Sequence, residues 1–139
     1  MITNFFFQTK TSLQNRSNLK LFITSIFQNE KTLVKDLNII FCSDEFLLNI
    51  NREYLQHDYL TDIITFEISN DDNGITAEIY ISIESVKKNA ADYQSTMKNE
   101  LHRVIFHGVL HLCGYKDKTK KDIVLMRSKE DNYLNHYFK

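Results

Sequence analysis

His107-Gly-Val-Leu-His111-Leu-Cys-Gly114-Tyr-Lys-Asp117 is the stretch that organises this sequence, because it sets two imidazoles one helical turn apart. Side chains four residues apart on an α-helix share a face, with Cβ atoms roughly 5–6 Å apart. Both rings can therefore reach one ion at the roughly 2.0–2.1 Å of zinc–nitrogen bonds. Gly114 can take the left-handed conformation that ends a helix, and the turn can bring Asp117 back toward the open side of the ion. The stretch predicts a metal site made by His107, His111 and Asp117.

The residue after the first histidine separates this stretch from the metalloprotease motif H-E-x-x-H, whose glutamate is the general base. Here that residue is Gly108, so peptide hydrolysis by that mechanism lacks its proton acceptor. A glycine inside a helix costs about 1 kcal/mol relative to alanine. This indicates a close approach to the backbone, either by a packed neighbour or by a substrate, and the sequence leaves both open.

The stretch resembles the signature of the YbeY family of metal-dependent endoribonucleases and rRNA maturation factors, H-G-x-L-H-L-x-G-Y-D-H. A second segment, Asn51-Arg-Glu-Tyr54 with Asp58 and Thr61-Asp62-Ile-Ile-Thr-Phe66, resembles the family's N-x-x-Y-R-x-x-D-x-x-T-D-V-L-S-F run. The resemblance implies a single domain over residues 1–139 that cleaves single-stranded RNA with a bound metal. It also implies a role in maturation of the 3′ end of small-subunit rRNA and in ribosome biogenesis, with the small ribosomal subunit as partner.

Two departures from the family pattern bear on the chemistry. The third histidine of the signature falls at Asp117, and the arginine that follows the tyrosine falls at Leu55. A carboxylate is an accepted zinc ligand, and a His₂–carboxylate set with an open position is a catalytic arrangement. Leu55 cannot replace a cation, so a phosphate contact would pass to Arg52 or His57, or the activity is weakened. The alternative function is a non-catalytic ribosome-assembly or RNA-binding factor with a structural metal.

The expected cofactor is one Zn²⁺ per chain, although the same donors accept iron, manganese or nickel. Cys113 lies two residues after His111 and is expected to point to another side of the helix. Glu100 can orient a metal-ligating side chain through a hydrogen bond, or it can form an ion pair with Arg103 three residues later. The remaining candidates also read as turn, cap, core or surface residues: Asp58, Asp62, His57, His102 and His136.

Composition fits one globular domain, since 42% of the 139 residues are hydrophobic and 25% are charged. No apolar run approaches the roughly 18 residues needed to span a bilayer. Phe5-Phe6-Phe7 is too short for the apolar region of a signal peptide, and two cysteines without a C-x-x-C pair fit a reducing compartment. A cytoplasmic protein without a membrane segment is expected, and its oligomeric state is not predicted.

Charge alone does not indicate a nucleic-acid binder, because the net charge is −1 and such domains are usually basic throughout. A transient RNA substrate needs only a local patch of phosphate contacts. Basic residues gather near the metal motif and on the helices before it, although a solvated helix start explains such runs equally well: Lys116, Lys118, Lys120, Lys121, Lys87, Lys88, Lys98 and Arg103.

Hydrophobic periodicity predicts the order βαβαββααα, an α+β fold in which helices pack on a four-stranded mixed sheet. Strands are expected at 2–7, 37–42, 63–68 and 75–81, the last two joined through Asn73-Gly74, which suits positive φ. Helices are expected around 19–27, after an N-cap at Ser43, after an N-cap at Ser82, at 98–113, and at 120–136 after a Thr119-x-x-Asp122 capping box. Two helices are expected to bury the following side chains: Phe46, Leu47, Ile50 and Tyr54 on one, and Ile83, Val86, Ala90 and Tyr93 on the other.

Overall fold

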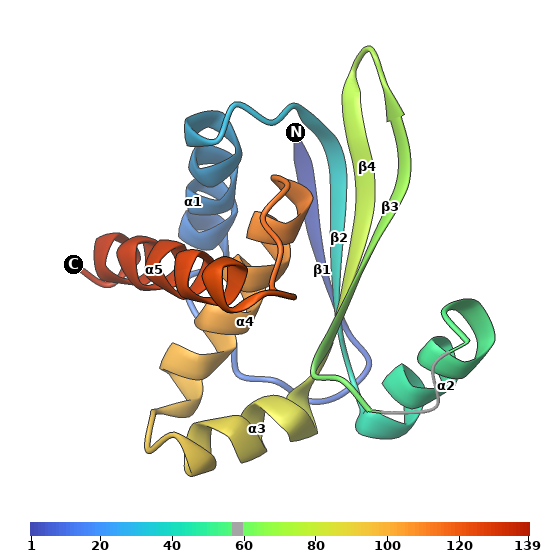
Figure 1. The fold of residues 1–139 in the computed structure, drawn as a ribbon, viewed down its shortest axis with the longest axis vertical. Helices are drawn as coiled ribbons and strands as arrows, with labels where there is room; N and C mark the ends of the chain where they lie inside the picture. The colour runs from blue at the N-terminus through green and yellow to red at the C-terminus, as the bar shows by residue number, and fades with distance from the viewer. Residues whose placement is uncertain (57–59) are drawn as a thin grey trace.

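The computed structural model describes residues 1–56 and 60–139, so the predictions for His57 and Asp58 lie outside the described residues. The predicted element order and the α+β class are confirmed (Figure 1). The elements are β1 (Ile2–Phe7), α1 (Arg16–Asn29), β2 (Val34–Cys42), α2 (Asp44–Tyr54), β3 (Ile63–Asp71), β4 (Gly74–Ser82), α3 (Ile83–Asp92), α4 (Met97–Leu112) and α5 (Lys120–Tyr137).

The four strands form one mixed sheet in the order β1-β2-β4-β3. The pairs β1–β2 and β2–β4 are parallel, and β3 runs antiparallel to β4. Of the Asn73-Gly74 pair expected at the hairpin, only Gly74 has a positive φ, at 113°. A Cβ atom on Gly74 would lie 2.7 Å from the carbonyl oxygen of Leu33, so only glycine fits there without a shift.

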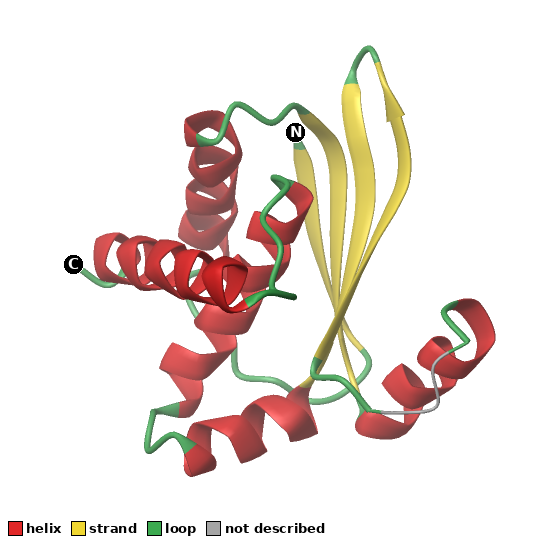
Figure 2. Ribbon diagram, in the orientation of Figure 1, coloured by secondary structure: helices red, strands yellow, loops and turns green. Residues whose placement is uncertain are grey.

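Helices α1, α4 and α5 gather on one side of the sheet, and α5 lies across α1 and α4 (Figure 2). The main core forms where α1 and α4 meet the sheet, and it includes the fully buried side chains of Ile23, Ile79 and Ile105. The central position of α4 explains why nine of its residues are buried. None of the described helices is both long and apolar enough to cross a membrane.

Gly108 lies where α4 packs tightly against the sheet. A Cβ atom there would lie 2.8 Å from Cδ1 of Ile63 and 3.1 Å from both Cδ1 and Cγ2 of Ile79. The glycine therefore accommodates a packed neighbour, and of the two readings left open by the sequence this is the one the structure supports. The same contact means that the residue after the first histidine faces the sheet.

Three predicted core residues are instead exposed. Phe46 and Tyr54 are 37% and 70% exposed, because α2 stands at one end of the sheet (Figure 1) and buries only the narrow stripe of Leu47, Ile50 and Asn51. Tyr93 is 66% exposed because α3 ends at Asp92, one residue earlier. The hydrophobic pattern identified these helices correctly but overestimated the width of their buried faces.

The helix starts follow the predicted caps. Ser43 accepts a hydrogen bond from the backbone N–H of Phe46, and Ser82 accepts one from that of Ser85. Thr119 and Asp122 form both hydrogen bonds of a capping box at the start of α5. The capping box fixes where α5 begins, which in turn fixes the length of the loop that carries Asp117.

Candidate metal centre

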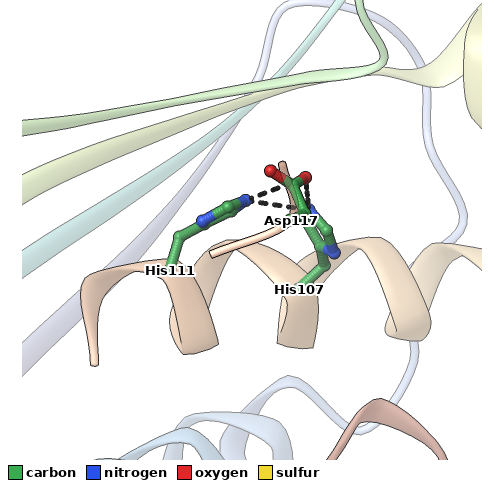
Figure 3. Close-up of side chains that lie close together, drawn as sticks. All are labelled: His107, His111 and Asp117. Atoms are coloured by element: carbon green, nitrogen blue, oxygen red, sulfur yellow. Dashed lines mark hydrogen bonds and ion pairs between the residues drawn. The ribbon is translucent and has the colours of Figure 1, made fainter. Parts of the chain in front are cut away.

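The three predicted ligands come together in space (Figure 3). Nε2 of His107 and Nε2 of His111 lie 3.0 Å apart. Oδ2 of Asp117 lies 3.2 Å from the first nitrogen and 3.3 Å from the second. Donors bound tetrahedrally at about 2.05 Å from one zinc ion would be about 3.3 Å apart. The arrangement therefore has the dimensions of one face of a tetrahedral site, and these residues can hold a metal ion.

The chain places Asp117 by ending α4 with a Schellman motif. Gly114 takes a φ of 101°, its N–H donates to the carbonyl of His111 at 3.0 Å, and the N–H of Tyr115 donates to the carbonyl of Leu110 at 3.1 Å. This pair of bonds reverses the chain direction just after the helix. The carboxylate of Asp117 then lies over the two imidazoles (Figure 3), as the turn at Gly114 predicts.

Two hydrogen bonds orient the imidazoles. Nδ1 of His111 donates to the carbonyl oxygen of Tyr115 at 2.9 Å, and Nδ1 of His107 donates to Oε2 of Glu130 at 2.6 Å. Each bond keeps the proton on Nδ1, so that in the neutral ring the lone pair on Nε2 is directed to the site. Three acceptor atoms thus converge, which is favourable only when a cation or a proton lies between them.

Glu130 on α5 is a partner of the candidate centre that the sequence did not indicate. It is only 4% exposed, and its second oxygen, Oε1, accepts from Nη1 of Arg103 at 3.0 Å. Arg103 also donates to Asp131 at 2.7 Å. The guanidinium of Arg103 is therefore committed to α5, and the predicted ion pair with Glu100 is not the one that forms.

Burial and neighbouring charges shift the pKa values of His107 and Asp62. Burial alone lowers the pKa of His107, but the hydrogen bond and charge of Glu130, with the charges of Asp117 and Asp62, raise it overall. Burial raises the pKa of Asp62, and the nearby His107 only partly offsets this. Asp62 accepts a hydrogen bond from the Asn89 amide at 3.2 Å. Asp62, which matches the family's second segment, therefore lies close to the centre without being one of its three donors.

Further predictions concern the thiol of Cys113 and two lone histidines, His102 and His136. Cys113 is outside the three-donor cluster, as expected from its position on the helix, and burial raises the pKa of its thiol to about 11. His102 is a core residue, 3% exposed, whereas His136 is exposed near the end of α5. Neither histidine belongs to the three-donor cluster.

A cleft of about 290 Å³ opens beside the centre. His107 and Asp117 line one part of it, and its cationic lining among the described residues consists of Arg103 and Arg127. Arg52, which the sequence reasoning offered as a replacement for the family arginine, lies on α2 and does not line this cleft. The other described lining residues are Asp62, Asn89, Tyr93, Glu100, Val104, Ile123, Met126 and Glu130.

Fold and site together define an α+β protein with a candidate His-His-Asp metal centre at the edge of a cleft. The chain belongs to the YbeY family, because the family model described as Endoribonuclease YbeY matches residues 4–138. The resemblance seen in the motifs is thereby confirmed.

Curated relatives carry the same description. Endoribonuclease YbeY of Cytophaga hutchinsonii is 50% identical over 135 residues, which cover 96% of this chain and 94% of the relative. That of Flavobacterium johnsoniae is 45% identical over 131 residues, 94% of each chain. The solution structure of a protein from Thermotoga maritima aligns with a TM-score of 0.61 and 25% identity, covering 99% of this chain and 89% of the other.

Proposed function

We propose that this chain is a metal-dependent endoribonuclease that cleaves single-stranded RNA. The observation that carries the proposal is the convergence of Nε2 of His107, Nε2 of His111 and Oδ2 of Asp117 in a chain whose relatives are described as Endoribonuclease YbeY. Its substrate in this proposal is the maturing 3′ end of small-subunit rRNA, in the cytoplasm and in association with the small ribosomal subunit. Residues 1–139 act as one domain.

The proposed ligands of one zinc ion are His107, His111 and Asp117, and manganese, iron or nickel would fit the same donors. Such an ion, when bound, lowers the pKa of a water ligand toward about 7 and polarises a phosphoryl oxygen. The Asp117 side chain is 44% exposed, so the site faces solvent on that side and is accessible to a phosphodiester.

The protein's own side chains have distinct tasks in this proposal. Glu130 and the carbonyl of Tyr115 hold the two imidazoles in the tautomer that binds metal. Arg127, whose side chain is 52% exposed, offers a guanidinium to a phosphate of the RNA. Arg103, 16% exposed and paired with Glu130 and Asp131, fixes the carboxylate that orients His107.

The alternative, a ribosome-assembly factor with a structural metal, is favoured by Leu55 at the position of the family arginine. Structural zinc sites are normally closed by four protein ligands, whereas the cluster found within residues 1–56 and 60–139 has three. This count supports the nuclease. A metallopeptidase of the H-E-x-x-H type is disfavoured further, since Gly108 faces Ile63 and Ile79 and not the metal site.

The test compares labelled single-stranded RNA with the same RNA in a perfect duplex, with chelator and after zinc is restored. We expect cleavage of the single strand that chelator abolishes and zinc restores, together with about one divalent ion per chain by elemental analysis. His111→Ala should lose both metal and cleavage. His136→Ala, a change at an exposed histidine on α5, is the matched control and should keep both.

Two results would contradict the proposal. Equal cutting by His111→Ala would identify a contaminating nuclease. Tight RNA binding by the metal-loaded wild type without any cutting would instead support the assembly factor.

A further inference from the structure

Glu100 is a buried carboxylate that the metal centre does not use. It is 5% exposed and lies seven residues before His107 on α4, about 10.5 Å away along the helix axis. No hydrogen bond to its carboxylate forms among the described residues, and its oxygens touch solvent, because the buried unpartnered side-chain atoms of the described residues are limited to Oγ1 of Thr3. Burial raises the pKa of Glu100, although the charges of Arg103 and Arg127 oppose this. A ligand that carries hydrogen-bond donors can therefore reach these two acceptor oxygens.

Glu100 faces a groove that continues the cleft of the metal centre. A second hollow, of about 390 Å³, adjoins the first and shares four lining residues with it: Tyr93, Glu100, Arg103 and Arg127. The second hollow is also lined by Ser95 and Asn99, near the start of α4. The groove therefore runs along α4 from His107 toward the N-terminal end of the helix, with Glu100 midway.

Tyr93 offers an exposed aromatic ring at the same place. Its side chain is 66% exposed at the end of α3, and it lines both hollows. Exposed aromatic rings beside a groove provide stacking surfaces for unpaired bases. Tyr93 and Glu100 thus present a stacking surface and a hydrogen-bond acceptor to one groove.

We propose that this part of the groove is a nucleobase subsite, in which Tyr93 stacks on an unpaired base and Glu100 binds the Watson–Crick edge of guanine. The inference rests on the proposed function, because the subsite would bind the nucleotide next to the phosphodiester that is cleaved. The separation of about 10 Å along α4 suits a base whose own phosphate lies at the metal centre. Arg127, which lines both hollows, contacts a neighbouring phosphate.

The preference for guanine follows from the donors that each base presents. Guanine carries two adjacent donors, N1–H and N2–H, which match the two oxygens of an ionised carboxylate. Adenine and cytosine present one donor beside an acceptor, and uracil presents one donor between two acceptors. Each of these three bases would place a lone pair against Glu100, so binding to the subsite is weaker.

The first test maps cleavage in uridine oligomers that carry one guanosine, inosine or adenosine at the same position. Inosine lacks only the N2 amino group of guanine. We expect cutting next to guanosine to be about tenfold faster than next to adenosine, with inosine between them. The same oligomers are also compared for binding to metal-free protein by fluorescence anisotropy, which does not depend on cleavage.

Substitutions test whether Glu100 and Tyr93 recognise the base or only support the fold. Glu100→Gln presents one donor and one acceptor, which match adenine, so the preference should shift from guanosine to adenosine. Glu53→Gln, at an exposed position on α2, should leave the preference unchanged. Tyr93→Ala should raise KM about tenfold for every oligomer, while Tyr93→Phe, which keeps the ring, should not.

Each outcome decides between the two proposals. Equal cutting and equal binding of guanosine, inosine and adenosine oligomers would overturn the subsite while the nuclease stands. Preferential binding of the guanosine oligomer without any cutting would support the subsite and overturn the nuclease. If Glu100→Gln fails to fold, the comparison of guanosine with inosine on wild-type protein still decides.

Discussion

Nδ1 of His107 lies 2.6 Å from Oε2 of Glu130, so a hydrogen bond ties the metal centre on α4 to the last helix of the chain. The carboxylate has little freedom to move, because it is 4% exposed and its other oxygen is bonded to Arg103. A carboxylate behind a ligating histidine fixes the tautomer and strengthens the imidazole as a ligand. Glu130 is therefore expected to set metal affinity without touching the metal.

Glu130→Gln should lower metal affinity by about 10–100-fold, the range found when such an outer partner is lost. The amide keeps the size of the side chain and removes its charge. Competition with a chromophoric chelator measures the affinity. Glu53→Gln, the same change at an exposed position on α2, is the matched control and should bind as wild type does. Unchanged affinity in Glu130→Gln would show that Glu130 only packs α5 against α4.

Gly108→Ala should destabilise the fold and spare the metal. The new Cβ atom would lie 3.1 Å from two atoms of Ile79, a side chain that is fully buried. Overpacking of this kind costs about 1–3 kcal/mol, while alanine regains only about 1 kcal/mol of helix propensity. Urea denaturation should show a net loss of about 1 kcal/mol at unchanged metal content. A gain in stability would mean that the sheet yields freely at Ile63 and Ile79.

His102 should make the metal-free protein less stable in mild acid. Burial holds the pKa of this imidazole below its ordinary value, although the hydrogen bond between Nδ1 and the carbonyl of Lys98 opposes the shift. Below about pH 6.5 the unfolded chain therefore takes up a proton that the folded chain refuses. The free energy of unfolding falls as the pH drops from 6.5 toward the lowered pKa of the folded state.

The measurement for His102 is the slope of unfolding free energy against pH between about 6.5 and 5, where an unperturbed histidine begins to titrate. His102→Phe keeps a ring against Tyr137, on which His102 stacks with centroids 5.2 Å apart, and removes the titrating group. The difference between wild type and variant isolates His102 from the other histidines. An identical slope in both proteins would contradict the prediction.

The features that the sequence predicted correctly depend on residues that lie close together in the chain. The capping box of Thr119 and Asp122 and the serine caps of α2 and α3 are local hydrogen bonds, and all three formed as expected. The pair His107 and His111 was equally accessible, because a helix fixes where residues four apart must lie. The Gly114 turn then brought Asp117 to them.

Contacts between distant segments could not be predicted in the same way. Glu130 stands between Lys129 and Asp131, a context typical of a solvated face, and its partner His107 is 23 residues earlier. One signal was available: Met126, Glu130 and Tyr133 are spaced for one helical face, and all three are buried. A carboxylate in an apolar stripe needs a partner, but the stripe does not say which cation or donor supplies it.

Asp117 distinguishes a metal ligand from a loop carboxylate. If it only favoured the start of α5, its negative charge would contribute about 0.3–1 kcal/mol through the helix dipole. If it is the third ligand, Asp117→Ala leaves two donors, and metal affinity should fall by more than the 10–100-fold expected at Glu130. Asp117→His should keep the metal, because imidazole is an equally good zinc ligand.

The measurement combines chelator competition with thermal unfolding in the absence and presence of zinc. A ligand that binds only the folded state stabilises it by about 2.7 kcal/mol at a concentration one hundred times its Kd. Zinc should therefore raise the Tm of the wild type and of Asp117→His, and leave that of Asp117→Ala nearly unchanged, while the three metal-free proteins melt within a few degrees of one another. Wild-type affinity in Asp117→Ala would remove Asp117 from the site, and the 3.2 and 3.3 Å contacts to the two imidazoles would then be ion pairs with protonated histidine.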